Sequence, residues 1–314
     1  MITGPCWSGL GPKTSAARPF STARRTCGSG SICVRCCPAK ANRTSFGMCL
    51  VCLLWAEKAF YCTPPTKESR FTSYFIGGYR QSEFEPEARG KLDLGGYFYA
   101  GTTFADAEGR RIAIGWLKER RSREASVKVG WCGCLSLPRS LSLTPGQGMK
   151  SEPISELRQL RHNHRHFGTR TVTASEPGAL RDLGVRAMEI VAEFELGTAL
   201  EVGLRVPRSP QGEEEMLIGY NALANELYID ATNASMSPDA DNRRSADAIR
   251  LSDRRHVKFH MFVDHSVIEA CVNGSAITTR VYPLLKQSRS IGVFAKGGAA
   301  RLVAMDLWDM RSIW

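Results

Sequence analysis

The feature that most constrains the fold of this chain is a period-two recurrence of apolar side chains in its second half. Every second residue is apolar in two runs, at Met188, Ile190, Ala192 and Phe194 and again at Val257, Phe259, Met261 and Val263. Such a period places these side chains on one face of a β-strand. The acidic residues that alternate with the first run, Glu189, Glu193 and Glu195, are expected mostly in water.

A hairpin signal follows the second run. Asn273-Gly274 separates the strand-like residues 267–272 (VIEACV) from a return strand expected over residues 276–282. Asn and Gly both tolerate the positive φ angles that a two-residue hairpin turn requires. This half of the chain therefore predicts a β-sandwich.

Short β-rich runs also occur earlier, over residues 74–79, 97–104 and 110–116. The last two are joined by the turn sequence Asp106-Ala-Glu-Gly109. Short strands at regular spacing between glycine-containing turns are typical of a propeller blade or a sandwich, so the whole chain is predicted to be all-β.

The first seventy residues have a different composition. Residues 1–56 contain no Asp or Glu but seven Lys and Arg, and eight of the eleven cysteines lie between Cys6 and Cys62. Such a start is typical of a transit peptide, or of a segment that is not native coding sequence. The apolar run 48–56 is shorter than the ~20 residues that span a bilayer. We expect an irregular segment over residues 1–70 and no membrane span.

Two C-x-x-C pairs in this segment suggest a metal site. Cys33, Cys36, Cys49 and Cys52 supply four thiols at a spacing near that of a zinc ribbon. Against zinc, the second pair lies in an apolar run without the glycines of a knuckle turn. An accidental cysteine-rich stretch remains the alternative.

The net charge of +11 raises the question of a nucleic-acid partner. Most of this excess comes from the acid-free N-terminal segment, and the rest is spread over a mixed-charge sequence. No basic stripe is interleaved with aromatic residues. We therefore expect no nucleic-acid partner.

Several longer segments carry a family resemblance. They are, in chain order, residues 92–100 (LDLGGYFYA), 109–116 (GRRIAIGW), 130–139 (GWCGCLSLPR), 262–274 (FVDHSVIEACVNG), 279–283 (TRVYP) and 307–314 (LWDMRSIW). Over roughly residues 71–314 the chain resembles glycoside hydrolase family 32, the invertases and fructan hydrolases.

The resemblance implies a five-bladed propeller that carries the active site and a C-terminal sandwich beside it. The expected domains are the last propeller blade over residues 71–145, a linker over 146–170 and the sandwich over 171–314. The resemblance also implies hydrolysis of β-fructofuranosyl bonds in sucrose or fructans without a cofactor. It suggests secretion or a vacuole, although no clear signal peptide is present.

The catalytic motifs of the family are missing from this sequence. In the family, the nucleophile lies in W-x-N-D-P-N-G, a stabilising Asp in R-D-P and the acid/base in E-C. The nearest matches are Arg181-Asp182-Leu183 and, more weakly, Glu57. We expect a truncated and inactive form of a family member. The alternatives are a non-catalytic sandwich that binds carbohydrate or protein, and a truncated or incorrectly assembled gene product.

Three residues of the expected blade are candidates for substrate binding. By the family resemblance, Trp116 and Tyr99 could stack on a sugar ring, and Glu119 looks like a rim position of the pocket. For Trp116, a place in the blade core is the alternative. The other acids of this region, Asp93, Asp106, Glu108 and Glu124, are expected in turns and at solvated strand ends.

One further group of residues could bind a metal. His162, His164 and His166 would place three imidazoles on one face of a strand. Because they lie among arginines between two expected domains, a solvated linker is the favoured interpretation.

Overall fold

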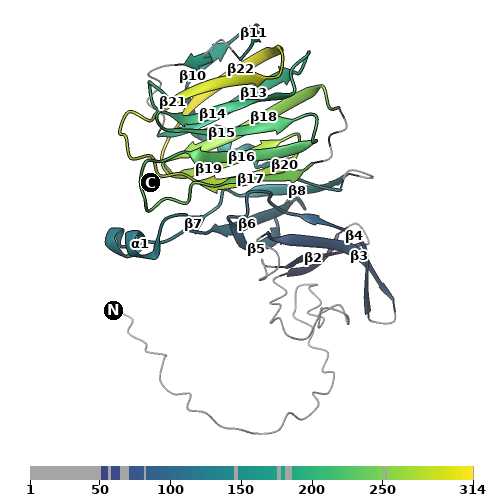
Figure 1. Cartoon of the computed structure of the whole chain (residues 1–314). Coiled ribbons are helices and arrows are strands. Elements are labelled where there is room, and N and C mark those ends of the chain that lie inside the picture. Colours follow the sequence, from purple (N-terminus) through teal and green to yellow (C-terminus); the bar gives the residue numbers. More distant parts are fainter. Residues whose placement is uncertain are drawn as a thin grey trace. The chain divides into compact units, whose positions relative to one another are not determined.

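The structure, a computed structural model, describes residues 51–55, 58–63, 71–80, 83–144, 148–174, 178–180, 186–249, 251 and 253–313. In this part of the chain the secondary structure consists almost entirely of antiparallel strands, arranged in four sheets (Figure 1). The all-β prediction is confirmed, and none of the helices in the described ranges is long and apolar enough to cross a membrane.

The first sheet has four strands in sequential order. They are β1 (Val51–Trp55), β2 (Lys58–Thr63), β3 (Ser73–Arg80) and β4 (Glu83–Lys91). Gly77 lets β4 approach closely, because a Cβ atom there would lie 1.9 Å from the carbonyl oxygen of Glu85. A four-stranded meander of this kind is the unit of a propeller blade.

Strands β1 and β2 fall in the segment 1–70, which the sequence predicts to be irregular. The sequence therefore shows about one blade, whereas the structure has a second four-stranded sheet before it. The physical reason is that the run 51–55 is uniformly apolar and shows no period-two pattern. Such a run can form a strand covered on both faces, and periodicity alone does not detect it.

The second sheet follows directly. It contains β5 (Phe98–Ala105), β6 (Arg111–Leu117), β7 (Cys134–Leu135), β8 (Arg139–Thr144) and β9 (Gly148–Pro153). The turn predicted between β5 and β6 is present, since the Gly109 N–H donates to the Asp106 carbonyl over 3.1 Å. The short helix α1 (Arg123–Val129), which the sequence analysis did not predict, separates β6 from β7.

The segment 146–170, expected as a linker, is structured throughout its described part. Strand β9 completes the second sheet, the 3-10 helix η1 (Ser155–Leu160) follows, and β10 (Arg161–Phe167) already belongs to the sandwich. Strand β10 lies at the end of its sheet and carries polar His and Arg side chains. The apolar alternation that marks buried strands is therefore absent from its sequence.

The remaining strands form two sheets. Their bounds are β11 (Arg170–Val172), β12 (Gly178–Leu180), β13 (Ala187–Glu195), β14 (Glu201–Arg208), β15 (Glu215–Asn221), β16 (Glu226–Asn233), β17 (Arg244–Ala248), β18 (His256–Asp264), β19 (Val267–Val272), β20 (Ser275–Arg280), β21 (Ser290–Lys296) and β22 (Ala300–Met310). One sheet has the order β10-β22-β13-β18-β19-β20, with β11 beside β22, and the other has the order β12-β21-β14-β15-β16-β17. The predicted hairpin joins β19 to β20, and Asn273 and Gly274 have φ angles of 48° and 89°.

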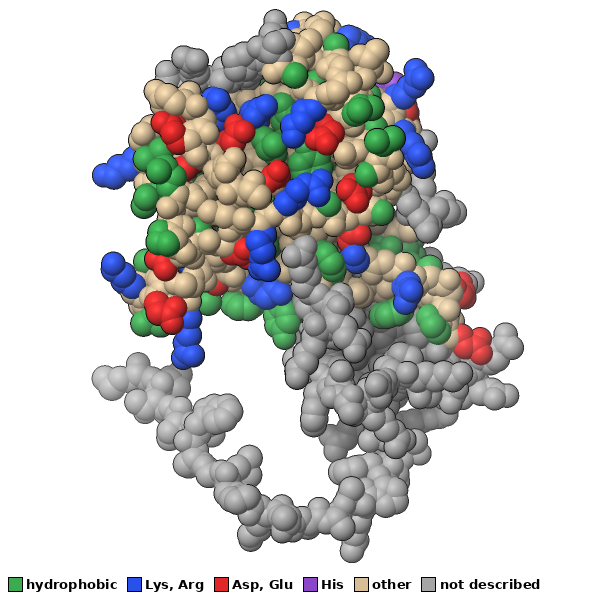
Figure 2. Space-filling model, viewed as in Figure 1, with side chains coloured by type: hydrophobic (Ala, Val, Ile, Leu, Met, Phe, Trp, Pro, Cys, Tyr) green, Lys and Arg blue, Asp and Glu red, His purple; other side chains and the backbone are tan. Residues whose placement is uncertain are grey.

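The surface of the described residues carries charges of both signs. Figure 2 shows acidic and basic side chains interspersed over the face it displays, with apolar side chains between them. Charged side chains of the described residues form pairs across neighbouring strands, such as Lys258 with Glu193 at 2.6 Å. No basic stripe is visible on this face.

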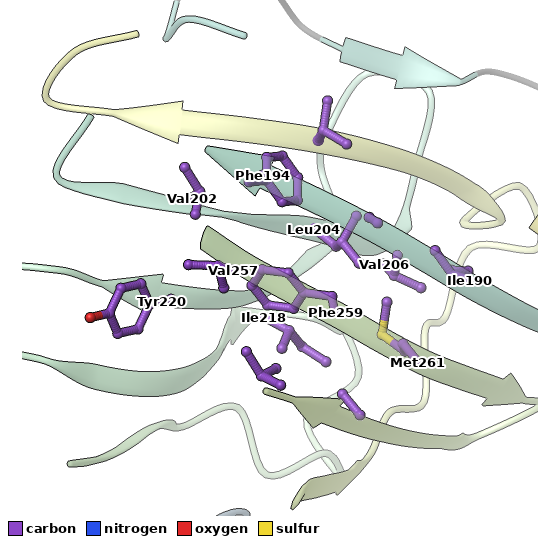
Figure 3. Packing of buried hydrophobic residues seen from close by; sticks show 14 of the residues in the cluster. Ile190, Phe194, Val202, Leu204, Val206, Ile218, Tyr220, Val257, Phe259 and Met261 are labelled. Atoms are coloured by element: carbon purple, nitrogen blue, oxygen red, sulfur yellow. The ribbon is translucent and has the colours of Figure 1, made fainter. Parts of the chain in front are cut away.

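The main core lies between the two sandwich sheets (Figure 3). The alternating residues of β13 and β18 point into it, and Ile190, Phe259 and Met261 have no exposed surface. Phe194 and Phe259 meet edge to face, with ring centroids 5.8 Å apart. Burying each side chain of this kind contributes about 1.5–3 kcal/mol, so this core is the main source of stability.

One acid of the first alternating run departs from the expectation. Glu189 is 1% exposed, because β13 lies between β22 and β18 in the middle of its sheet. Its carboxylate is paired with Arg161 of β10 and lies 2.6 Å from Nε2 of His260. The sequence does not reveal this pairing, because Arg161 lies in the segment expected as a linker.

Candidate functional site

The two aromatic candidates of the second sheet lie together. Tyr99 on β5 and Trp116 on β6 are direct cross-strand partners. Their ring centroids are 6.1 Å apart and the ring planes meet at 76°. Trp116 is 36% exposed, whereas its neighbour Leu117 points to the opposite face and is fully buried. Trp116 therefore lies outside the blade core, contrary to the alternative that the sequence left open.

A bulge in β5 sets which residues share this face. The register between β5 and β6 shifts between Tyr99 and Thr102, where Ala100 has a φ of 48°. As a result Phe104, at an odd spacing from Tyr99, pairs with Ile112 and lies on the same face. A bulge changes the parity of a strand in this way, and simple alternation does not predict it.

Two glycines allow close packing around β6, one against Trp116 and one against Phe98. A Cβ atom on Gly133 would lie 2.3 Å from the indole of Trp116, so the backbone of residue 133 lies directly against that ring. On the opposite side of the sheet, a Cβ on Gly115 would lie 2.4 Å from the ring of Phe98. The two contacts fix the position of the strand that carries Trp116.

Glu119, the third candidate, follows Trp116 at the end of β6. Its side chain is only 8% exposed and pairs with Arg121 at 2.8 Å. It also accepts hydrogen bonds from the backbone N–H groups of Arg120 and Arg121, over 2.9 and 3.2 Å. Burial opposes the charge, but the hydrogen bonds from the Arg121 guanidinium and from the backbone outweigh it and lower the pKa of Glu119 to about 2. Glu119 is therefore ionised at neutral pH and cannot serve there as a proton donor.

Two arginines and two aromatic rings pack beside Glu119. The guanidinium of Arg121 lies 4.3 Å from the ring centroid of Tyr282 and 4.6 Å from that of Trp131. Arg280 lies over the same two rings, at 5.5 and 5.3 Å. Contacts between a guanidinium and an aromatic face are attractive, so these side chains hold each other in place. The candidate site is thus a cluster of Tyr99, Trp116, Glu119 and this cation–aromatic group.

The loop that carries Glu119 is attached to the sandwich. Arg120 is 5% exposed, and its Nη2 donates to the carbonyl of Arg243 over 3.1 Å. The hydroxyl of Tyr97 donates to Asp241 over 3.0 Å. The sandwich therefore fixes the position of the loop next to Trp116.

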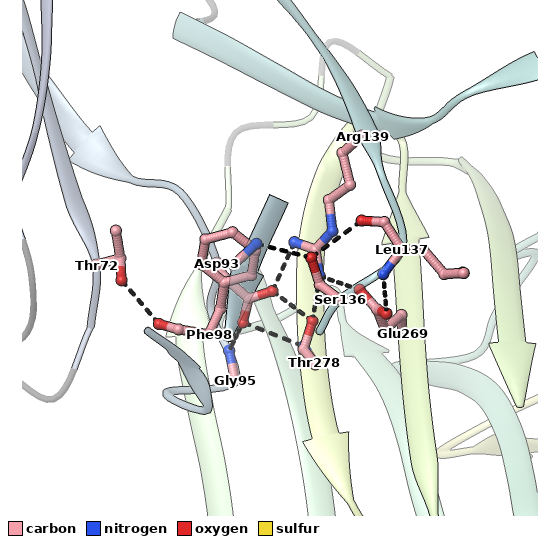
Figure 4. A network of polar contacts seen from close by, with 10 residues as sticks. Thr72, Asp93, Gly95, Phe98, Ser136, Leu137, Arg139, Glu269 and Thr278 are labelled. Atoms are coloured by element: carbon pink, nitrogen blue, oxygen red, sulfur yellow. Dashed lines mark hydrogen bonds and ion pairs between the residues drawn. The ribbon is translucent and has the colours of Figure 1, made fainter. Parts of the chain in front are cut away.

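A buried ionic network lies deeper between the second sheet and the sandwich (Figure 4). Arg139 of β8 is 3% exposed, and its guanidinium donates to Asp93 over 2.8 Å and to Glu269 of β19 over 2.5 Å. Asp93 also accepts from the Gly95 N–H over 2.8 Å and from the Thr278 N–H over 3.1 Å. The network joins the second sheet to the sandwich through charged groups that are paired with one another.

This network corrects the expectation for Asp93, which the sequence places at a solvated position. Asp93 is 1% exposed. Burial raises the pKa of Glu269, although the nearby Arg139 acts in the opposite direction. One signal in the sequence could have predicted the network. Arg139 follows Leu137-Pro138 at the start of an apolar stretch, and a charge buried there needs an acidic partner.

The other acids of the blade lie nearer to solvent. Asp106 accepts from the backbone N–H of Arg110 over 2.7 Å in the β5–β6 turn. Glu108 and Glu124 are exposed, and Glu124 lies in the first turn of α1. These three positions agree with the turn and surface places expected for them.

The three histidines of the segment that was expected to be a linker lie on β10. His164 and His166 both contact the same oxygen of Asp306, at 2.7 and 2.9 Å. Among the residues that the structure describes, no group of three or more His, Cys, Asp or Glu is arranged to hold a metal ion. Of the zinc candidates, Cys33, Cys36 and Cys49 lie outside the described residues, as do Glu57 and residues 181–183, and Cys52 lies in β1.

Comparison with known families decides the relationship of the chain. A model of the N-terminal domain of glycosyl hydrolases family 32 matches residues 33–153, and a model of the C-terminal domain of the same family matches residues 154–309. The chain belongs to glycoside hydrolase family 32. The two matches meet at residue 153, the last residue of β9.

Individual family 32 members are similar at moderate identity. A sucrose-6-phosphate hydrolase of Zymomonas mobilis is 26% identical over 245 residues, which cover 76% of this chain and 46% of that protein. One from Escherichia coli is 30% identical over 230 residues, covering 70% of this chain and 44% of the other. The chain spans less than half the length of these relatives.

The same relationship is seen among solved structures. Fructan 1-exohydrolase IIa of Cichorium intybus superimposes with a TM-score of 0.72 at 19% identity, covering 81% of this chain and 57% of that one. This likeness supports the fold: part of the family 32 propeller followed by the C-terminal sandwich. Of the three residues that the sequence singled out, Tyr99 and Trp116 are cross-strand partners, and Glu119 follows β6 and pairs with Arg121. The structure adds Arg121, Trp131, Arg280 and Tyr282, which the sequence analysis did not single out.

Proposed function

We propose that this chain supplies one wall of a β-fructofuranosidase-type active site, together with the sandwich that supports it. The observation that carries the proposal is the exposed Trp116, paired edge to face with the half-buried Tyr99 and followed three residues later by the ionised Glu119. An aromatic face stacks on the apolar face of a sugar ring, and a fixed carboxylate accepts hydrogen bonds from sugar hydroxyls. Both elements lie in the part that matches the N-terminal, propeller domain of the family.

The names of the relatives support a fructoside as the ligand. Levanase from Bacillus sp. strain L7 is 29% identical over 269 residues. The chicory fructan 1-exohydrolase IIa was also solved in complex with 1-kestose, and that complex matches this chain with a TM-score of 0.71 at 20% identity. We infer that the wall formed by Tyr99, Trp116 and Glu119 binds the fructosyl unit of sucrose or of a short fructan.

The chemistry requires further residues. A retaining glycosidase uses two carboxyl groups ~5–5.5 Å apart, one as nucleophile and one as acid and base. Glu119 does not fit the acid role, because it is ionised and already accepts several hydrogen bonds. The sequence holds no W-x-N-D-P-N-G, R-D-P or E-C motif. We propose that the reactive carboxylates belong to a part of the family fold outside this sequence, and that this chain alone binds fructosides without hydrolysing them.

The test combines binding and turnover on the purified chain. Intrinsic tryptophan fluorescence is titrated with sucrose and with 1-kestose, and release of free fructose is measured in the same samples. Saturable binding without release is the expected result. Release of fructose would contradict the assignment of the reactive carboxylates to residues outside this sequence. Absence of binding would contradict the proposal that Tyr99, Trp116 and Glu119 form a sugar-binding surface.

A further inference from the structure

Two thiols flank the glycine that lies against Trp116. Cys132 is exposed and Cys134 is half-buried, and neither takes part in a disulfide. Only Gly133 separates them: Cys132 directly follows Trp131, and Cys134 is the first residue of β7. This pair of thiols therefore lies beside Trp116, and the proposed sugar binding does not involve it.

The backbone permits the two thiols to meet. Two consecutive residues of extended chain span at most ~7 Å. A disulfide takes Cα separations of about 4.4–6.8 Å, so only slight shortening is required. Gly133 already has a φ of 69°, which is not an extended conformation. A side chain at this position would be strained, whereas glycine allows the turn to close.

A buried cation faces the inner thiol. Nη1 of Arg280 donates to Sγ of Cys134 over 3.2 Å, and Nη2 donates to the Ser266 hydroxyl over 2.8 Å. Arg280 is 1% exposed, and its Nε has no hydrogen-bond partner among the described residues. A positive charge next to sulfur stabilises the thiolate as it forms.

The two thiols differ in accessibility, which sets their order of reaction. Burial raises the pKa of Cys134, and the carboxylates of Glu269, Asp264 and Glu119 act in the same direction against Arg280. Cys134 is therefore a protonated thiol at neutral pH. Cys132, which is exposed, is the thiol that an outside reagent meets first.

Movement of this segment reaches the aromatic wall through two contacts. The backbone at Gly133 lies against the indole of Trp116, and β7 pairs with β6 through Leu135 opposite Trp116 and Cys134 opposite Leu117. Bond formation between Cys132 and Cys134 pulls on this backbone. A shift of this backbone would therefore press directly on the indole of Trp116.

We propose that Cys132 and Cys134 form a dithiol that a low-molecular-weight disulfide oxidises to an internal disulfide, and that closure weakens sugar binding at Trp116. In the first step the Cys132 thiolate attacks oxidised glutathione, forming a mixed disulfide and releasing one glutathione thiolate. In the second step Cys134 attacks Sγ of Cys132, and its proton passes to the departing second glutathione. Two thiols are oxidised and one glutathione disulfide is reduced to two glutathione thiols. The effect on sugar binding, though not the disulfide, rests on the proposed function.

The sequence offers a clean assay for the disulfide. Trypsin cleavage after Lys128 and Arg139 releases residues 129–139, which contain Cys132 and Cys134 and no other cysteine. The intact chain is equilibrated with reduced and oxidised glutathione at a range of ratios, blocked with an alkylating reagent, digested and weighed by mass spectrometry. The expected product is a peptide that lacks two hydrogens and carries no alkyl group. A peptide that carries only bound glutathione or two alkyl groups at every ratio overturns the disulfide.

Matched variants give the controls. Cys134→Ser is expected to stop at the mixed disulfide on Cys132, and Cys132→Ser is expected to react much more slowly. Cys271 serves as an internal reference, since burial raises its pKa to about 12 and it is expected to stay reduced. Equal reactivity of the two single variants would contradict the order of the steps.

The second measurement is 1-kestose binding by the reduced and the oxidised chain. Closure is expected to weaken binding roughly tenfold, equivalent to about 1.4 kcal/mol, which is the scale of one misplaced aromatic contact. A disulfide that leaves binding unchanged overturns the coupling to Trp116. If the disulfide forms but the reduced chain binds no sugar, the proposed function fails and the dithiol assignment stands.

Discussion

The sandwich and the second sheet differ in how far they bury their aromatic side chains. In the sandwich, Phe194, Phe259 and Tyr220 are almost completely buried in one continuous core. In the second sheet, one face packs Phe98 and Leu117 into a smaller core, while the other leaves Phe104 and Trp116 exposed. Buried aromatic residues are explained by stability. An exposed aromatic corner that is fixed by a glycine contact and flanked by paired charges indicates a binding surface.

The largest expected effect tests this comparison in the core. Phe259→Ala should destabilise the chain by about 3–5 kcal/mol, because it removes a fully buried ring and leaves a cavity. Phe104→Ala, at a site that is 48% exposed, should change stability by no more than ~0.5 kcal/mol. Urea denaturation followed by circular dichroism measures both. A similar cost for the two variants would remove the distinction between the two faces.

The buried ionic network should behave like a core element although it is charged. Arg139→Met should cost about 3–5 kcal/mol, because Asp93 and Glu269 then remain buried without their cation. The control is Lys258→Met, which removes an ion pair with the half-exposed Glu193 and should have little effect. The same denaturation experiment applies, and a small change for Arg139→Met would show that water replaces the guanidinium.

Glu119 should contribute to how the stability of the chain depends on pH in the acidic range. Its pKa in the folded chain is about 2, below the ordinary value of 4.5, so its ionised form stabilises the fold. This contribution is complete above pH ~4.5 and is lost as the pH falls from there toward ~2. Glu119→Gln should therefore flatten the decrease of the melting temperature over that window, measured against the unchanged chain. Identical slopes for the two proteins would contradict the hydrogen bonds assigned to Glu119.

The hairpin turn carries the smallest effect. The Asn273 side chain accepts from the Lys258 N–H over 2.7 Å and donates to the His256 carbonyl over 2.9 Å. Asn273→Ala should cost about 1–2 kcal/mol, through these bonds and the φ of 48°. Asn233→Ala, at an exposed strand end, is the matched control. Equal costs for both would mean that the turn does not depend on its side chain.

The sequence predicted the elements whose signal is local. The alternation in β13 and β18, the Asn273-Gly274 turn and the all-β class depend on neighbouring residues, and the structure confirms them. It missed β1, because a uniformly apolar run carries no period, and with it β2, which pairs with β1. It missed β10, because this strand at the end of its sheet carries polar His and Arg side chains and no apolar alternation.

The candidate site was predictable only in part, for a similar reason. Trp116, Tyr99 and Glu119 stand close together in sequence and follow from the family resemblance. Arg280 and Tyr282 reach the site from β20 and the residues that follow it, and no sequence pattern announces that approach. Asp93 was misplaced because its partners Arg139 and Glu269 come from two other strands.

The central claim is that the exposed corner at Trp116 binds a fructosyl unit. The most direct test compares 1-kestose binding by Trp116→Ala and Phe104→Ala using isothermal titration calorimetry, because the two residues share one face of the second sheet. The account predicts that Trp116→Ala weakens binding at least roughly tenfold while Phe104→Ala leaves it unchanged. Equal binding by both variants and the unchanged chain, or equal loss in both, would contradict it.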